Sequence, residues 1–397
     1  MSRDLRSEAT KFFVPLESLR GLAALVVVIY HAVWTNPVTA LHFFQNGSLM
    51  VDFFFVLSGF VIFHSYGRKL RSLTDILRFL FLRIGRLYPL HLAFLLVFLA
   101  IEVAKFVAEK KFGLVADKPA FAVNNGYAFL SNLLLIHALG LHHRVTFNIP
   151  SWSISTEFYA YVLFAAVRTS LRDDRHMAIA AVVIIAASAA TLYWAGVIPL
   201  DDAVVDWGFL RCCGGFFLGT LTYNAYSVFR AERSAGAGVR PGSWLSPLAL
   251  ATTLVFLSTT DPEGAWTYAL PPLAAFVILS SVLWPHPALQ KMLSAGPLRW
   301  LGRVSYSLYM VHAAVAWIIT QVLTVVLKFP KIEVAEGLGV GTPPLVGACV
   351  LLGYVLIVFV LANFTYRWIE EPFRKRSRVL AERWFPEATA PALQIAR

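Results

Sequence analysis

LESLRGLAALVVVIYHAVW, residues 16–34, is a long apolar stretch that carries an arginine and a histidine. Its length and hydropathy predict a membrane-spanning helix, with Arg20 near one membrane face and His31 about half-way across. The two residues are eleven positions apart, which corresponds to about 16 Å along a helix axis. Ionisable groups inside a membrane are costly and indicate a functional site by default. The structural alternative is a snorkelling arginine together with a histidine that binds a neighbouring helix.

The composition of the whole chain is that of a polytopic membrane protein. Of its 397 residues, 58% are hydrophobic and only 14% are charged, which leaves too little polar surface for a soluble protein of this size. The net charge of +11 lies in short basic clusters between apolar runs, as the positive-inside rule requires, so no nucleic-acid binding is predicted. Cys212, Cys213 and Cys349 show neither metal-ligand nor disulfide spacing. No metal site is therefore expected.

Ten apolar runs are long enough to span a bilayer, which predicts an all-α fold with about ten transmembrane helices. The runs lie near residues 16–36, 49–67, 79–104, 151–168, 177–198, 205–229, 244–260, 265–284, 304–327 and 343–366. A further run at 127–141 is short and contains Asn132 and His137, so it is not expected to cross.

The basic loops predict the topology of the chain. The densest basic segment, residues 68–86, is expected in the cytoplasm together with the N-terminus. Residues 168–175 reach the same side only if residues 127–141 do not cross, so this segment is predicted to be re-entrant or to lie between helices. Both termini then face the cytoplasm. The expected parts are a cytoplasmic N-terminal segment (1–13), one helical membrane domain (14–376) and a cytoplasmic tail (377–397).

Polar side chains recur in the second and third apolar runs. Asp52 lies near the external end of the second run, and Ser58 and Gly59 lie deeper, where small residues also serve helix packing. Arg83 and Arg86 are spaced i, i+3 on one helix face, and two such guanidinium groups can bind phosphates bidentately. Anchoring at a cytoplasmic helix end is the alternative interpretation of these arginines.

Carboxylates lie in two later segments. In PSWSISTEFYAY, residues 150–161, Ser153 lies at the external interface and Glu157 lies one to two turns inside the membrane. A structural salt bridge is the alternative for this carboxylate. Near the last apolar run, Glu370 and Glu371 stand among basic residues and are expected to form a surface ion-pair network.

A second histidine occurs in GRVSYSLYMVH, residues 302–312. Arg303 lies at the cytoplasmic end of this segment, and Tyr309 and His312 share a helix face at i, i+3. His312 is expected to position other groups by hydrogen bonding rather than to act as a base.

Six segments of the chain, in this order, resemble the integral-membrane acyltransferases of the acyltransferase-3 type. They are LESLRGLAALVVVIYH, VDFFFVLSGF, RIGRLYP, PSWSISTEFY, LGRVSYSLYMVH and YRWIEEPF. The resemblance extends from residue 14 to residue 376 and implies a ten-helix membrane domain. It also implies transfer of an acyl group from cytoplasmic acyl-CoA to a carbohydrate or another extracytoplasmic acceptor. No permanently bound cofactor is implied.

Depth in the membrane and the resemblance together assign roles to individual residues. Catalysis is assigned to His31 and Glu157, donor-phosphate binding to Arg20, Arg83, Arg86 and Arg303, and substrate or oxyanion contacts to Ser153, Tyr309, His312 and Asp52. Many members of the family carry a C-terminal SGNH-hydrolase-like domain. The sequence shows no such segment, so the chain resembles the stand-alone O-acyltransferases.

The predicted mechanism uses His31 as a general base. Neutral His31 would remove the proton of an acceptor hydroxyl, which then attacks the thioester. Glu157 would orient His31 or the sugar, and Tyr309 or Ser153 would help to stabilise the oxyanion. A covalent variant, in which His31 itself carries the acyl group, stays open.

Two other functions compete with acyl transfer. A membrane transporter or flippase also uses ionisable residues near the midplane, but the sequence lacks the paired broken helices that favour one. A non-catalytic sensor or scaffold is the second alternative. For the enzyme, acetyl is the expected acyl group, and the acceptor stays open among exopolysaccharide, O-antigen, lipid-linked oligosaccharide and small molecules. The expected location is a bacterial inner membrane, with the bilayer, acyl-CoA, the acceptor and glycan-assembly proteins as partners.

Overall fold

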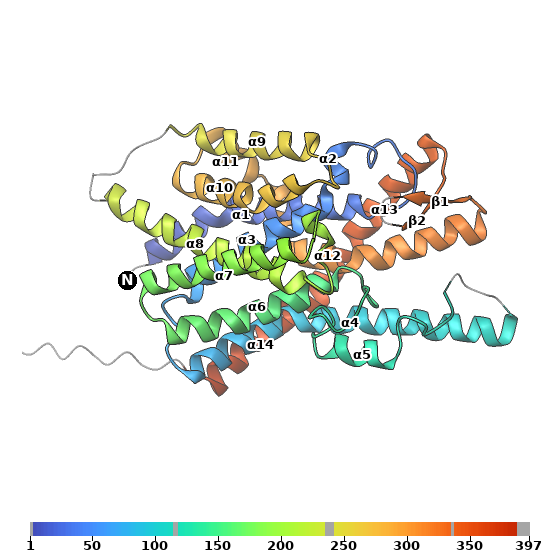
Figure 1. The fold of residues 1–397 in the computed structure, drawn as a ribbon, viewed down its shortest axis with the longest axis horizontal. Helices are drawn as coiled ribbons and strands as arrows, with labels where there is room; N and C mark the ends of the chain where they lie inside the picture. Colours follow the sequence, from blue (N-terminus) through green and yellow to red (C-terminus); the bar gives the residue numbers. More distant parts are fainter. Residues whose placement is uncertain (1–2, 114–117, 235–241, 335–336, 387–397) are drawn as a thin grey trace, which may run out of the picture.

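The apolar runs form a bundle of long helices (Figure 1). The computed structural model describes residues 3–113, 118–234, 242–334 and 337–386. The long helices are α1 (Arg3–Tyr30), α3 (Met50–Tyr66), α4 (Leu73–Phe112), α6 (Ser151–Ser170), α7 (Asp174–Trp194), α8 (Gly208–Ser234), α9 (Leu245–Thr259), α10 (Leu270–Leu283), α12 (Gly296–Gln321) and α13 (Pro344–Thr365). The shorter helices are α2 (His42–Gln45), α5 (Gly126–Leu133), α11 (Pro287–Leu293), α14 (Glu371–Trp384) and the turns η1 (Gly47–Leu49), η2 (Leu200–Asp202), η3 (Ala265–Ala269), η4 (Val322–Val326) and η5 (Tyr366–Glu370).

The predicted all-α class is confirmed, and each of the ten apolar runs coincides with one long helix. Within the described residues, the sheet structure is limited to the antiparallel hairpin of β1 (Lys331–Val334) and β2 (Gly337–Val340). Six helical stretches in the same part of the chain are long and apolar enough to cross a membrane: Gly47–Tyr66, Leu73–Phe112, Asp174–Trp194, Ala265–Leu283, Gly296–Val326 and Pro344–Trp384. Helices α1, α6 and α8 coincide with predicted runs but are not among these six stretches.

The first helix ends earlier than its hydropathy predicts. Helix α1 stops at Tyr30, so His31 lies at the helix end and not in mid-helix. The chain then turns, because the side chain of Asn36 accepts hydrogen bonds from the backbone N–H groups of residues 38 and 39. Trp34 is buried and its indole N–H donates to the carbonyl of Gly347 in α13. Tertiary contacts of Trp34 therefore replace the last predicted turn of the helix.

Glycines allow the central helices to approach one another closely. Gly21 of α1 lies directly against Gly302 of α12, and a Cβ atom at either position would overlap with the backbone of the other helix. Gly59 of α3 and Gly219 of α8 form a second contact of the same kind. Such small residues let helix backbones pack closely inside membranes. Gly59 therefore serves helix packing, which was one of the roles considered for it from the sequence.

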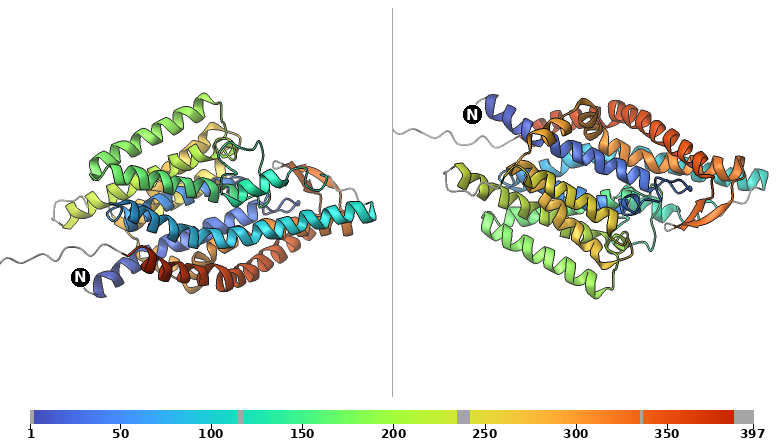
Figure 2. Two further views of the ribbon diagram at one scale, coloured as in Figure 1. Left: turned by 90° about the horizontal axis from the view of Figure 1, so that it is seen from below. Right: turned by 90° about the horizontal axis from the view of Figure 1, so that it is seen from above.

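The two ends of the bundle differ in structure (Figures 1 and 2). The start of α1 and helix α14 lie at one end, and the β1–β2 hairpin lies at the other. Helix α5 occupies the start of the segment 127–141, which was not expected to cross the membrane. It has eight residues, which is about 12 Å of helix and too short to span a bilayer.

Candidate active site

A cavity of about 120 Å³ lies between five helices of the bundle. It is lined by Arg20 of α1, by Val51, Phe54, Phe55, Leu57, Ser58, Val61 and Ile62 of α3, by Arg83, Arg86 and Leu87 of α4, by Ser153, Ile154, Glu157 and Tyr161 of α6, and by Ser305, Tyr306 and Tyr309 of α12. Six of the ten residues predicted for the site therefore meet around one space, although they come from four apolar runs and more than 280 positions separate the first from the last.

Arg20 is held in the cavity wall by helix α12. Its Nε donates to Ser305 Oγ at 3.0 Å, and its Nη2 donates to the carbonyl oxygen of Gly302 at 2.8 Å. The close contact between Gly21 and Gly302 brings the two backbones near enough for these bonds. The arginine is thus fixed by interhelical hydrogen bonds and does not snorkel away from the bundle.

The two arginines of α4 line the same cavity, as their i, i+3 spacing predicts. Arg83 Nη2 donates to the hydroxyl of Tyr66 at 3.1 Å, and its guanidinium lies over the rings of Tyr66 and Phe79. Its Nε is buried without a hydrogen-bond partner. Among the described residues, Arg86 makes no hydrogen bond or ion pair. These arginines therefore retain N–H donors for a ligand.

Two of the hydroxyl groups that line the cavity, those of Ser153 and Tyr309, lie at the end away from Arg83. Ser153 Oγ and the hydroxyl of Tyr309 are 2.9 Å apart, and the Tyr309 ring packs against Phe54. Arg83 contacts Tyr66, which is twelve residues further along α3 than Phe54, a separation of about 18 Å along the helix axis. The cavity is therefore cationic at one end and hydroxyl-lined at the other.

Glu157 lies between these ends and is bound to a neighbour on its own helix. Its Oε1 accepts a hydrogen bond from the Tyr161 hydroxyl at 2.6 Å, and the Tyr161 oxygen is also 3.0 Å from Ser58 Oγ. The predicted role of Glu157 in orienting His31 is not supported, because the described residues include no contact between them. The separation along α6 explains this result, since Glu157 is one turn deeper than Ser153.

His31 and His312 form a pair next to the hydroxyl end, outside the residues that line the cavity. Their ring centroids are 4.9 Å apart, and the His312 and Tyr309 rings are 5.7 Å apart. His31 Nδ1 is 2.9 Å from the carbonyl oxygen of Val27. A carbonyl only accepts, so Nδ1 carries the proton and Nε2 of the neutral ring keeps its lone pair. His312 is fully buried, and neither ring nitrogen has a hydrogen-bond partner among the described residues, so the hydrogen-bonded positioning role expected of it has no partner there.

Asp52, predicted to contact the substrate or the oxyanion, does not line the cavity. It is buried and forms a two-bond ion pair with Arg211 of α8, with N–O distances of 3.0 and 2.7 Å. Arg211 also lies over the ring of Trp152, 5.4 Å from its centroid. Sequence reasoning missed Arg211, although an arginine inside an apolar run was a usable signal. Each carboxylate oxygen of Asp52 thus accepts a hydrogen bond from Arg211 in a structural contact.

Arg303 is also separated from the cavity. It is exposed at the start of α12, whereas Ser305 and Tyr306 line the cavity wall. One helical residue corresponds to a rotation of about 100°, so positions 303 and 305 point to different sides of the helix. Arg303 therefore does not join Arg20, Arg83 and Arg86 in the cavity wall, where the sequence placed all four together.

Glu370 and Glu371 were both expected in a surface ion-pair network, and only Glu371 is found in one. Glu371 pairs with Arg374 and with Lys375. Glu370 is buried, and Ser307 Oγ donates to its Oε2 at 2.7 Å. The π-helical turn η5 explains the difference, because it rotates Glu370 into the bundle just before α14 begins.

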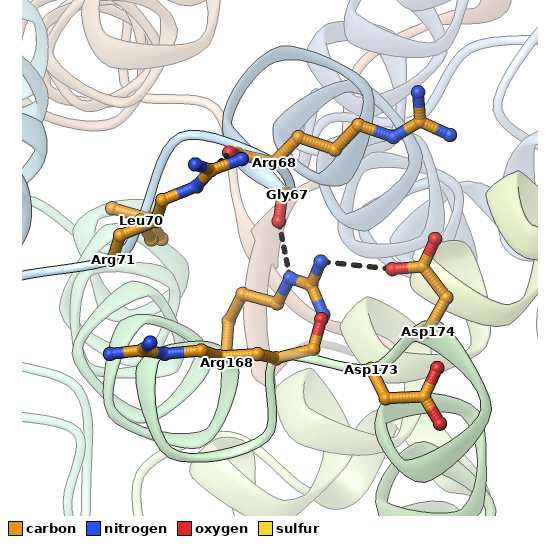
Figure 3. Close-up of a pocket in the computed structure, with 8 residues that line it drawn as sticks. Gly67, Arg68, Leu70, Arg71, Arg168, Asp173 and Asp174 are labelled. Carbon is orange, nitrogen blue, oxygen red and sulfur yellow. Dashed lines mark hydrogen bonds and ion pairs between the residues drawn. The ribbon is translucent and has the colours of Figure 1, made fainter. Parts of the chain in front are cut away.

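A second, larger pocket of about 550 Å³ lies between the α3–α4 and α6–α7 loops (Figure 3). At its centre the buried Arg168 donates to the carbonyl oxygens of Gly67, Leu171 and Arg172 and pairs with Asp174. These contacts occupy the N–H donors of Arg168, so its role in this pocket is structural. The pocket shows that the two basic loops lie at one end of the bundle, as the predicted threading requires.

The sequence profile of the acyltransferase-domain family matches residues 14–363 of the chain. The chain belongs to this family. The predicted resemblance to acyltransferase-3 proteins is thereby confirmed, and the matched residues include every arginine, histidine and hydroxyl group of the candidate site.

Named members of the family are similar over most of the chain. The peptidoglycan O-acetyltransferase OatA of Listeria monocytogenes is 24% identical over 384 residues, 92% of this chain and 56% of its own length. The putative membrane-bound transacylase BcsY of Komagataeibacter xylinus is 28% identical over 349 residues, 86% of this chain and 81% of its own. The O-acetyltransferase OatA of Staphylococcus aureus is 23% identical over 385 residues. The chain thus spans little more than half the length of the OatA proteins. No solved structure shows significant similarity to it.

Proposed function

We propose that the chain is a membrane O-acyltransferase that moves an acetyl group from cytoplasmic acetyl-CoA to a hydroxyl of an extracytoplasmic or lipid-linked carbohydrate. The observation that carries this proposal is the polarity of the cavity between the five helices, with arginines at one end and the Ser153 and Tyr309 hydroxyls beside a histidine pair at the other. O-acetyltransferase names among its relatives support the reaction type. In this proposal the ten long helices cross the bacterial inner membrane and both termini are cytoplasmic.

The arginine end suits the phosphates of coenzyme A. Arg20, Arg83 and Arg86 supply guanidinium groups, which bind phosphate oxygens in a fixed, forked geometry. The basic loops at the same end of the bundle support a cytoplasmic orientation for this end. A long pantetheine arm would then lie along the cavity and bring the thioester to the hydroxyl end.

The hydroxyl end suits the transfer step. Nε2 of neutral His31 accepts the proton of the acceptor hydroxyl, whose oxygen attacks the thioester carbon. The tetrahedral intermediate collapses, the C–S bond breaks and the CoA sulfur takes the proton from His31. Ser153 and Tyr309 can donate hydrogen bonds to the oxyanion. The alternative with acyl-His31 uses the same nitrogen as nucleophile.

Membrane vesicles of defined orientation test the proposed reaction. Radiolabelled acetyl-CoA added to inverted vesicles, whose cytoplasmic face is outside, should label a carbohydrate acceptor. Sealed right-side-out vesicles with the same amount of protein should not use acetyl-CoA added outside. Equal labelling by both preparations would contradict the donor side, and uptake of an intact solute without label transfer would support a transporter instead.

Replacing an arginine of the cavity should impair use of the donor specifically. We expect Arg83→Ala to raise the KM for acetyl-CoA about tenfold, because charge-assisted hydrogen bonds to phosphate are lost. The KM for the acceptor should change little. Arg303→Ala is the matched control, since Arg303 is an exposed arginine outside the cavity. If both variants behave alike, Arg83 is only a membrane anchor.

A further inference from the structure

Glu370 is a buried carboxylate that the proposed reaction does not use. It is 3% exposed and is the last residue of the π-helical turn η5 between α13 and α14. Its Oε2 accepts a hydrogen bond from Ser307 of α12 at 2.7 Å. Isolated π-helical turns frequently occur at functional sites. A single hydrogen bond does not compensate for the burial of a full negative charge.

The packing of α14 brings Glu370 towards the arginines of the cavity. Gly85 lies between Arg83 and Arg86, and a Cβ atom there would overlap with the side chain of Ser377 in α14. Helix α14 therefore rests directly on α4 at the level of the two arginines.

The turn η5, which ends at Glu370, packs against α4 and α12. The charges of three arginines, Arg86, Arg20 and Arg374, act on Glu370 there. Arg374 is already paired with Glu371. The other two line the cavity. Arg86 and Arg20 also act on each other as like charges. The cavity thus contains clustered positive charges on side chains that are partly buried.

We propose that Glu370 is the built-in counter-charge of Arg20 and Arg86, and that it limits the affinity of the cavity for coenzyme A. This inference rests on the proposed function. When the cavity is empty, the carboxylate offsets the repulsion between the arginines. When the anionic donor is bound, the same carboxylate opposes its phosphates, so that the product CoA dissociates after transfer. Glu370 acts through the arginines and is a positioning residue.

Glu370→Gln tests this inference, because glutamine keeps an oxygen that accepts from Ser307 but removes the charge. We expect the variant to bind coenzyme A about three- to tenfold more tightly than the wild type. CoA should therefore raise its thermal unfolding temperature in detergent by more than it raises that of the wild type. The inhibition constant of CoA in the vesicle assay should fall by the same factor.

Two further variants separate charge from other effects. Glu371→Gln removes the neighbouring carboxylate, which pairs with surface cations, and should leave CoA affinity unchanged. Ser307→Ala removes the hydrogen bond but keeps the charge, so CoA affinity should again stay near the wild-type value. If Glu370→Gln does not accumulate, Glu370→Met supplies a neutral side chain of similar size.

The outcomes distinguish this inference from the proposed function. If coenzyme A does not stabilise the wild type at all, the proposed donor is wrong. If it stabilises the wild type, and the neutral variants at position 370 bind it as Glu371→Gln does or more weakly, Glu370 has no role in limiting CoA affinity. Tighter binding in both the 370 and 371 variants would indicate a general surface-charge effect and would also overturn the inference.

Discussion

Acyl transfer should fall at least about 100-fold when His31 is replaced by alanine, the range lost with a general base. The reason is the tautomer that the Val27 carbonyl favours: Nδ1 holds the proton, so Nε2 is the basic nitrogen of a ring that pairs with His312 next to the hydroxyl end of the cavity. Protein should still accumulate in the membrane, because His31 is only half-buried and lies beyond the last helical turn. The measurement is label transfer from acetyl-CoA in inverted vesicles, normalised to the amount of chain.

His42→Ala is the matched control for this prediction. His42 is an exposed histidine in α2, shortly after His31 in the chain, and its replacement should leave transfer unchanged. Normal acylation by the His31 variant would exclude both the base and the acyl-carrier role. To separate these two roles, vesicles without acceptor can be treated with labelled acetyl-CoA. Label that stays on the wild-type chain and is lost in His31→Ala supports the covalent route.

Replacing one partner of the Asp52–Arg211 pair should produce the largest loss of stability. Both side chains are 1% exposed, and removal of one partner from a buried pair costs about 3–5 kcal/mol because the other charge is left uncompensated. We expect Asp52→Asn to reduce the amount of folded protein and to lower the thermal unfolding temperature in detergent. Asp261→Asn, at an exposed loop carboxylate, should have little effect.

A double variant separates structure from chemistry at this pair. Asp52→Leu combined with Arg211→Met removes both charges, so stability should recover relative to either single variant. If the pair is structural, the double variant should retain acyl transfer. Stable protein without activity would instead return Asp52 to the substrate-contacting residues. Equal stability of Asp52→Asn and the wild type would contradict the buried ion pair.

The cavity shows which parts of the site were accessible to sequence reasoning. Arg20, Arg83 and Arg86 were predicted to act together, and they line one space. Each stands inside an apolar run, where a charge is costly and therefore informative. Ser153 and Tyr309 carry no charge and were assigned from their depth and from the family resemblance; they contact each other.

Other predictions failed where local pattern and tertiary position diverge. Arg303 and Arg20 both stand at the start of an apolar run, so the sequence does not distinguish them. Arg303 nevertheless faces outward. The contact between Gly21 and Gly302 decides which side of α12 faces α1. Glu370 and Glu371 are adjacent in a basic segment, and a π-helical turn that no simple periodicity reveals sends one inward.

The sequence by itself determined the membrane class, the position of each long helix and the family, because hydropathy over about 20 residues and short ordered motifs are local properties. The tertiary structure alone decided which polar groups meet. Asp52 and Arg211 are 159 positions apart, and Ser307 and Glu370 are 63 apart. Such pairings depend on which helices pack together and on how each is rotated. The buried charge of Glu370 therefore acquires its partners, and its proposed role, only in the folded bundle.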